Sequence, residues 1–307
     1  MNAPVILFVY NRIKHVEKSL TALSKNRLAK QSDIYIYSDG PKNTDDNKKV
    51  VEVRNFVSDK KWLNYFKSIT IITSSKNKGL ACSVIDGVTN IISMYGKVIV
   101  IEDDCISSVE FLSFMNDCLN FYEKSDRIWS ISGYTFNIEY PQDYSNDVYV
   151  MGRTCSYAWA TWVDRWNKVD WEVKTYSLFK YDYQLRKKFN IYGMDRSRML
   201  DEQQLGIKDS WAIRFCYAMF RNNMLTIYPR YTKIQNVGYT EGTHISSKNI
   251  VDNPFEVDLD REEHSYVLVK QLEVNEEIKK QFVKNFKRNK VKLFISYIFN
   301  VILKIKR

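Results

Sequence analysis

Short apolar runs alternate with segments of helical periodicity over the first hundred residues. The runs, rich in β-branched residues, are Val5–Tyr10, Ile34–Tyr37, Ile69–Thr73 and Val98–Ile101. Within residues 15–24, 48–56 and 80–94, apolar side chains recur three or four positions apart, as on one face of a helix. Continuous apolar strands that alternate with helices are typical of parallel sheets. The pattern predicts an α/β, Rossmann-like fold with a mostly parallel sheet and helices on both faces.

Polar side chains follow each of these four runs. The clusters are Asn11-Arg12, Ser38-Asp39-Gly40, residues 74–77 ending in Asn77, and Glu102-Asp103-Asp104. In open α/β sheets, ligands bind at the carboxyl ends of the strands. The alternative is that polar residues simply end the strands. Three adjacent acids repel one another unless a cation lies nearby, so the set favours a ligand site.

The first strand–helix turn, Tyr10-Asn11-Arg12-Ile13, has no glycine. A dinucleotide fold needs glycine there so that the backbone can approach the pyrophosphate, and the P-loop pattern is also missing from the sequence. A bound phosphate would then need a metal and an arginine. Mg²⁺ and Mn²⁺ prefer oxygen ligands, including carboxylates. In an extended segment, Asp104 and Glu102 would face one side and Asp103 the other.

The middle of the chain is rich in tryptophan. Trp129–Gly133 is predicted as a further strand. Trp159, Trp162 and Trp166 are spaced as one stripe of a helix. Such a stripe either packs in a core or lines a sugar site, because indole joins an apolar face to an N–H donor.

Two further residues are candidates for chemistry. Asp209 opens an apolar helical segment, where it could be a helix cap or a catalytic carboxylate. His244 ends a polar loop, from Asn236, that contains two of the ten glycines. This loop is predicted to act as a lid, and His244 is either an ordinary loop residue or a contact to metal or pyrophosphate.

The charge is concentrated at the end of the chain. The net charge is +10, and ten basic residues and no acidic ones follow position 278, so residues 1–278 hold 36 charges of each sign. A nucleic-acid-binding fold would spread positive charge over a folded face, so no nucleic-acid partner is expected. Residues 291–305 place a narrow polar stripe on an otherwise apolar helix. This predicts an amphipathic helix on an anionic membrane surface, or else a terminal helix docked on the protein's own core or on a second subunit.

The remaining features indicate the cellular compartment in which the protein is expected. The five cysteines form no CxxC pair, which favours a reducing environment. We find no signal peptide pattern and no apolar stretch long enough to span a bilayer. A cytoplasmic protein on the inner face of the cell membrane is expected.

The layout resembles GT-A-fold nucleotide-sugar glycosyltransferases. It is most similar to the inverting N-acetylglucosaminyltransferase I group and its bacterial sugar-transferase relatives. The matching pieces lie between residues 5 and 244 and are Val9–Arg12, Tyr37–Gly40, Asn77–Leu80, Ile101–Asp104, Tyr157–Trp166, Asp209–Trp211 and Gly238–His244. The resemblance implies a GT-A catalytic domain over residues 1–245, with a nucleotide-binding half to 104 and an acceptor and sugar half from 105. Residues 246–278 would be a linker and 279–307 a basic membrane-associating tail.

The resemblance also implies roles for individual residues. The acidic triplet would be the DxD-type motif, with Asp104 on the metal and Asp103 near the ribose. Asp39 would read the uracil edge, and Arg12 would help to hold the nucleotide or its phosphates. Asp209 would be the general base. Glu102 and Asn77 are expected to bind the donor, His244 the metal, and Trp159, Trp162 and Trp211 the sugar side.

There are two departures from the family. Ser210 and Lys208 replace an acid and an aromatic residue beside the base, so N-acetylglucosamine is not implied as the donor sugar.

These features favour a Mn²⁺- or Mg²⁺-dependent inverting glycosyltransferase. It would use a nucleotide diphosphate sugar, most simply a UDP-sugar, and a saccharide acceptor that could be lipid-linked, as in bacterial surface polysaccharide synthesis. Two alternatives remain, namely a nucleotidyltransferase that makes sugar nucleotides and a non-catalytic scaffold at the membrane.

Overall fold

The computed structural model describes residues 2–238, 258–260, 266–270 and 273–286. His244, the predicted lid past Gly238 and the amphipathic segment 291–305 lie outside these residues. The strands are β1 (Val5–Val9), β2 (Asp33–Ser38), β3 (Ser68–Thr73), β4 (Lys97–Glu102), β5 (Cys105–Ser107), β6 (Ile128–Ser132), β7 (Val148–Met151), β8 (Ala158–Trp162), β9 (Leu225–Pro229) and β10 (Ile234–Asn236). The helices are α1 (Ile13–Ser24), α2 (Thr44–Val57), α3 (Leu80–Tyr95), α4 (Phe111–Phe121), α5 (Val163–Trp166), α6 (Tyr176–Tyr181), α7 (Tyr183–Phe189), α8 (Arg196–Gln204), α9 (Trp211–Arg221) and α11 (Glu276–Lys284).

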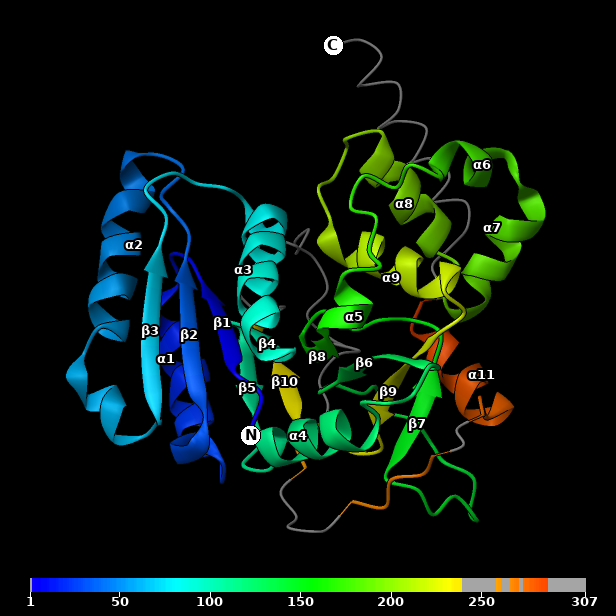
Figure 1. Ribbon diagram of the computed structural model, residues 1–307, viewed down its shortest axis with the longest axis horizontal. Coiled ribbons are helices and arrows are strands. Elements are labelled where there is room, and N and C mark those ends of the chain that lie inside the picture. Colours follow the sequence, from blue (N-terminus) through cyan, green and yellow to red (C-terminus); the bar gives the residue numbers. More distant parts are fainter. Residues whose placement is uncertain (1, 239–257, 261–265, 271–272, 287–307) are drawn as a thin grey trace, which may run out of the picture.

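Within residues 2–238, the main sheet has eight strands in the order β3-β2-β1-β4-β8-β6-β9-β7 (Figure 1). The half from β3 to β4 is parallel throughout. β8 then joins antiparallel to both β4 and β6, β9 runs parallel to β6, and β7 is antiparallel at the far edge. The predicted α/β class with a mostly parallel sheet is therefore confirmed. The chain order reverses direction between β1 and β4, so these two strands form the switch point of the sheet.

The buried side chains of the described residues gather on the two faces of this sheet. Val5, Leu7 and Val9 of β1 pack with α1, α2, α4 and α11 on one face. Ile6 and Phe8, which point the other way along the strand, pack with α3, α5 and α6–α9 on the other. Helices on both faces were predicted, and the continuous burial of β1 explains why its residues form an unbroken apolar run.

The tryptophan-rich segment differs from its predicted helical stripe, and that prediction is wrong. Residues 158–162 form β8, and only Val163–Trp166 is helical. Alternate residues of a strand point to opposite faces, so Trp159 joins the core with α3 and α9 while Trp162 joins the core with α4. The spacing of three positions had matched a helix by coincidence.

A small second sheet brings a distant segment to the end of β4. β5 follows β4 after a two-residue turn and pairs antiparallel with β10, with Cys105 opposite Asn236. The backbone N–H of Val237 donates to the carbonyl of Asp104 at 2.9 Å. Residues 236–238 are thereby fixed beside the turn that carries Asp103 and Asp104.

α11 is docked on the folded body. Ile278 and Phe282 are fully buried in the same core as β1, and the Phe282 ring packs against Phe136, Tyr149 and Tyr228. The boundary predicted between residues 278 and 279 therefore falls within a helix. Among the described residues, we find no helix that has both the length and the apolar character needed to cross a bilayer.

Candidate functional site

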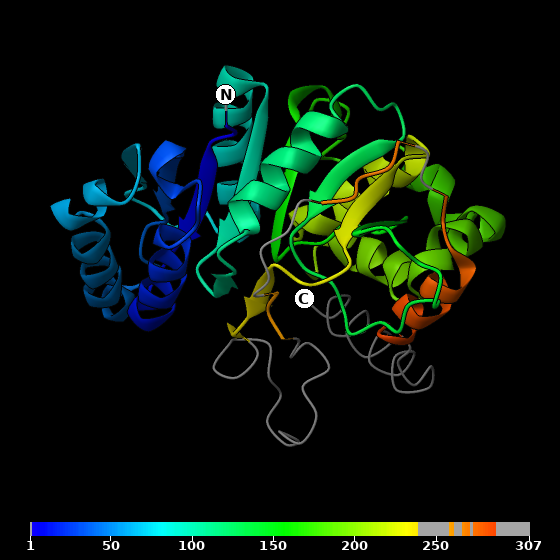
Figure 2. The same ribbon diagram turned by 90° about the horizontal axis from the view of Figure 1, so that it is seen from below.

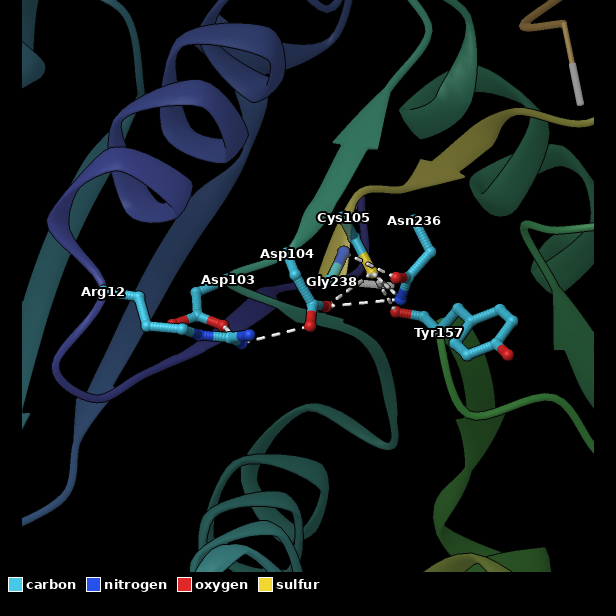
Figure 3. Close-up of polar contacts among 7 residues, drawn as sticks. All are labelled: Arg12, Asp103, Asp104, Cys105, Tyr157, Asn236 and Gly238. Atoms are coloured by element: carbon cyan, nitrogen blue, oxygen red, sulfur yellow. Dashed lines mark hydrogen bonds and ion pairs between the residues drawn. The ribbon is translucent and has the colours of Figure 1, made fainter. Parts of the chain in front are cut away.

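The site lies where the switch point of the sheet places the loops after β1 and β4 side by side. Arg12 occupies the N-cap position of α1, in the short loop after β1, and its side chain makes no capping bond. Asp103 and Asp104 form the turn between β4 and β5. Because β1 and β4 are parallel neighbours, these side chains meet at the carboxyl edge, as the sequence predicts (Figure 3).

Arg12 joins the two aspartates. Its Nη2 donates to a carboxylate oxygen of Asp103 and, at 3.0 Å, to Oδ2 of Asp104. Its Nε lies 3.4 Å from the second oxygen of Asp103. The predicted alternation, with Asp103 and Asp104 on opposite sides, is thus wrong, because the two residues form a turn in which both carboxylates reach one guanidinium (Figure 3). One positive charge between two acids reduces their mutual repulsion.

The other side of Asp104 is formed by residues 236–238. The Nδ2 group of Asn236 donates to Oδ1 of Asp104 at 3.3 Å, and the Oδ1 atom of Asn236 accepts from the Gly238 N–H at 2.9 Å. A Cβ at position 238 would overlap Oδ2 of Asp104. Glycine is therefore needed for this close approach. Asp104 is held between Arg12, which follows β1, and Asn236, the last residue of β10.

Burial controls the protonation of the other two acids. Burial, followed by the nearby Asp104 and Asp103, raises the pKa of Glu102 well above its usual value. Burial also raises the pKa of Asp103 to about 6, even though Arg12 opposes that shift. Burial therefore favours the neutral form of Glu102, which makes it a less suitable cation ligand. The side chain of Asp104, 13% exposed, is the better one.

The residues present fit a hard divalent cation that brings further ligands with it. Mg²⁺ and Mn²⁺ bind through one or two carboxylates and complete their shells with phosphate oxygens and waters. Asp104 supplies such a carboxylate, fixed in direction by Arg12 and Asn236. The neighbouring thiol of Cys105 is a poor ligand for a hard cation, and burial raises its pKa. Among the described residues, no group of three or more His, Cys, Asp or Glu side chains is arranged to hold a metal by itself.

The loops after β2 and β3 are held together by a separate set of bonds. The carboxylate of Asp39 accepts from the backbone N–H groups of Gly40, Lys78 and Gly79 at 2.8–3.1 Å. Asn77 donates to the carbonyl of Gly40 at 2.8 Å. Both predicted donor-binding residues therefore fix the loops at the carboxyl edge, next to the N-terminus of α3.

The predicted tryptophan wall is not present. Trp159, Trp162 and Trp211 are all buried. Trp159 stacks on Trp211 with ring centroids 4.9 Å apart, and the Trp162 N–H donates to the carbonyl of Leu119 at 3.1 Å. These rings pack in the two cores that cover the faces of the sheet. Their assignment to the sugar side of a site is therefore corrected.

Asp209 lies just before α9 and is not its cap. Ser210 is the N-cap, and its Oγ accepts from the Ile213 N–H at 3.4 Å. Asp209 is 59% exposed, and its Oδ1 accepts from Arg214 at 2.7 Å. The capping interpretation is wrong, and the carboxylate is accessible one residue before the helix cap.

Sequence reasoning missed several residues that organise the site. Asn236 lies in the segment predicted as a lid, but its bond to Asp104 was not expected. The Cys105 thiol donates to the Tyr157 carbonyl at 2.8 Å, which ties the turn to the loop before β8. Arg54 of α2 donates to the carbonyls of Ser38, Asp39 and Ser74. A lone arginine on a helix gives no signal for such a role.

Comparison with known proteins gives remote structural likenesses. The sequence matches no family model and no curated protein. TarS 1–349 from S. aureus shares 15% identity over 76% of this chain and 60% of its own, with a TM-score of 0.43. The mannosyltransferase PcManGT from Pyrobaculum calidifontis, in complex with GDP-Man and Mn²⁺, shares 12% identity over 53% of this chain and 45% of its own, with a TM-score of 0.36.

A UDP-glucose pyrophosphorylase complexed with UDP-glucose shares 12% identity over 78% of this chain and 95% of its own, with a TM-score of 0.38. The chain spans 21% of a longer S. aureus TarS structure. Likenesses this low do not assign the chain to a family.

Proposed function

We propose that the protein is a metal-dependent inverting glycosyltransferase that uses a nucleotide diphosphate sugar. The observation that carries this proposal is the placement of Asp104. It is a partly exposed carboxylate at the switch point, oriented by Arg12 on one side and by Asn236 on the other. Ligands bind at this position in open α/β sheets, and the turn after β1 has no glycine cradle for phosphate.

The chain's own residues divide the task of binding the donor. Asp104 would hold Mg²⁺ or Mn²⁺, which when bound neutralises charge on the departing diphosphate. Arg12 keeps Asp103 and Asp104 side by side and lies next to the expected phosphate position. Asp39 and Asn77 shape the loops that would receive the base and ribose. His244 remains a proposed contact to the metal or pyrophosphate.

We assign the general base to Asp209. It would take the proton from an acceptor hydroxyl as that oxygen attacks the anomeric carbon from the face opposite the diphosphate. A single displacement inverts the configuration through an oxocarbenium-like state. The acceptor would be a saccharide, and an amphipathic tail at 291–305 would let it be lipid-linked at the inner face of the cell membrane.

A donor-hydrolysis screen over UDP-, GDP- and dTDP-sugars with Mn²⁺ tests the proposal. The expected result is release of a nucleoside diphosphate from one donor class. Formation of a nucleoside triphosphate from a sugar nucleotide and pyrophosphate would show a nucleotidyltransferase instead. No turnover and no nucleotide binding would favour a scaffold.

Asp209→Asn tests the base. Sugar transfer should fall by a factor of at least about 100, while nucleotide affinity should stay unchanged. The variant should still fold, because the exposed ion pair between Asp209 and Arg214 contributes only ~0–1 kcal/mol to folding. Asp164→Asn is the matched control, because Asp164 is 56% exposed and also paired with an arginine at 2.7 Å. Equal activity in the two variants would remove Asp209 from catalysis.

A further inference from the structure

The most exposed large apolar side chains of the described residues lie close together in the sequence. Tyr181 is 81% exposed, Tyr183 is 73% exposed and Leu178 is 70% exposed. They come from α6 and the start of α7, at the end of the molecule opposite α2 and β3 (Figures 1 and 2). The carboxyl-edge site uses none of them, so their exposure needs another explanation.

The two short helices present these side chains outward and anchor themselves inward. Leu178 and Tyr181 are three positions apart on α6 and share a face. Phe179 and Phe189 are fully buried and pack edge to face, with ring centroids 5.5 Å apart. Asp182 caps α7 by accepting from the Leu185 N–H at 2.8 Å. The exposed rings therefore project from an ordered support.

Unpaired basic residues lie beside the exposed rings in the sequence. Residues 174–194 contain five basic residues and one acidic residue, Asp182. Of the five, Lys174 pairs with Glu172 and Arg186 with Asp201, which leaves three lysines. Lys180, Lys187 and Lys188 are exposed, and within the described part of the chain none of them has a carboxylate partner. The Lys180 ammonium lies 5.1 Å from the centre of the Tyr181 ring.

We propose that this aromatic corner, formed by Leu178, Tyr181 and Tyr183 with Lys180, Lys187 and Lys188, docks on an anionic lipid bilayer. Tyrosine rings are favoured at the headgroup level, where the ring is buried and the hydroxyl remains wet. Leucine inserts into the acyl boundary, and lysines bind anionic headgroups while their stems lie along the apolar surface. A saccharide would stack on the rings but would need neither the leucine nor the excess charge.

The aromatic corner and the basic tail are separate segments of the sequence. The aromatic corner belongs to the folded body, so it would set the orientation of the body on the membrane. The proposal rests on surface chemistry and does not depend on the proposed sugar transfer. Nucleotide binding is measured without vesicles, so failure of either proposal can be told from failure of the other.

Vesicle sedimentation of the full chain tests the docking surface. The variant L178S/Y181S/Y183S should bind vesicles with about 30% phosphatidylglycerol at least about fivefold more weakly than the wild type. The control L63S/Y65S/M94S removes three exposed apolar side chains elsewhere and should bind as the wild type does. Equal binding by the corner variant would overturn the proposal, as would equal wild-type binding to neutral vesicles.

A second measurement reports contact at the corner itself, whatever the tail contributes. In a Cys82→Ser background, which removes an exposed cysteine, an environment-sensitive dye is attached through Tyr181→Cys or, as control, Leu63→Cys. Anionic vesicles should shift the emission of the dye at 181 to shorter wavelength and leave the dye at 63 unchanged. No shift at 181 would show that the corner does not enter the bilayer and would overturn the proposal.

Discussion

At the scale of single residues, two clusters of charged side chains in the described part of the chain are stabilised by ion pairing. Arg12 lies between Asp103 and Asp104 at the site. Far from it, Arg153 and Asp195 form a paired set of hydrogen bonds of 2.9 and 3.0 Å. A charge taken out of water is costly unless it is paired and hydrogen-bonded.

Asp195→Asn should destabilise the protein in a pH-dependent way. Although burial opposes it, Arg153 lowers the pKa of Asp195 below its usual value. The ion pair therefore contributes stability that is fully present above the ordinary aspartate pKa and is lost as pH falls through the lowered one. Urea unfolding should show a cost of about 3 kcal/mol at pH 7 and a smaller cost at about pH 3. A cost that stays constant or grows as pH falls would contradict this assignment.

Gly238→Ala should weaken metal-dependent nucleotide binding by about tenfold or more, because the added methyl group overlaps Oδ2 of Asp104. The thermal midpoint should change little, since Gly238 is only partly buried and follows the end of β10. Val237→Ala is the control on the same segment and adds no atom near Asp104. Calorimetric titration measures both variants. Unchanged affinity in Gly238→Ala would show that the close approach does not matter for binding.

At the scale of elements, the first half of the sheet could be predicted, and of the second half only β6 (Ile128–Ser132) was, as the strand at Trp129–Gly133. The apolar runs at 5–10, 34–37, 69–73 and 98–101 match β1–β4 to within one or two residues. Each is a continuous apolar strand with a polar end, which is a strong local signal. β8 was misread because three tryptophans happened to have helical spacing. β7 and β9 are short aromatic strands without alternation, which local patterns do not distinguish from a loop or buried helix.

The contacts of the site also divide into those that the sequence predicted and those that it did not. The meeting of Arg12 with the acidic turn follows from parallel strands sharing an edge, so the sequence predicted it. The contact of Asn236 and Gly238 with Asp104 depends on a chain reversal across more than 130 positions, which no local pattern encodes. From the sequence, the buried tryptophans could be assigned either to a core or to a surface. Only their packing in the folded protein distinguishes these two assignments.

Phe282→Ala tests whether α11 is part of the folded body. Phe282 is fully buried and packs against four aromatic rings, those of Phe136, Tyr149, Tyr228 and Phe286. Truncating a buried phenylalanine costs about 3–5 kcal/mol, so the free energy of unfolding should fall by that amount. Lys280→Ala, on the exposed face of the same helix, should change it by less than about 0.5 kcal/mol. Equal small effects would mean that α11 is not firmly docked.

At the scale of the whole molecule, a buried ion pair fastens a late segment to the body. Lys233, just before β10, pairs with Asp260. The backbone N–H of Asp260 also donates to the Thr232 carbonyl at 2.9 Å. Because β10 leads directly to Asn236 and Gly238, this pair links the segment after the predicted lid to the position of Asp104.

Asp260→Asn leaves the buried Lys233 without its counter-charge and should cost about 3–5 kcal/mol of stability. The double variant Lys233→Met with Asp260→Leu removes both charges and should recover most of that loss. Chemical unfolding of both variants measures the difference. A double variant no more stable than Asp260→Asn would show that the charges themselves are not what fastens the segment.

The central claim is that Asp104 holds a divalent cation that recruits a nucleotide diphosphate. Calorimetric titration of UDP with and without Mn²⁺ tests it on the wild type, Asp104→Asn and Asp33→Asn. Asp33 is the control, because it is also paired with a basic residue and its side chain has a similar exposed fraction, 15%. It lies at the start of β2, at the end of the strand away from the carboxyl edge. The account predicts that Mn²⁺ strengthens UDP binding by about tenfold or more in the wild type and in Asp33→Asn, and not in Asp104→Asn. Equal Mn²⁺-dependent binding in all three proteins, or no binding of UDP by any of them, would contradict it.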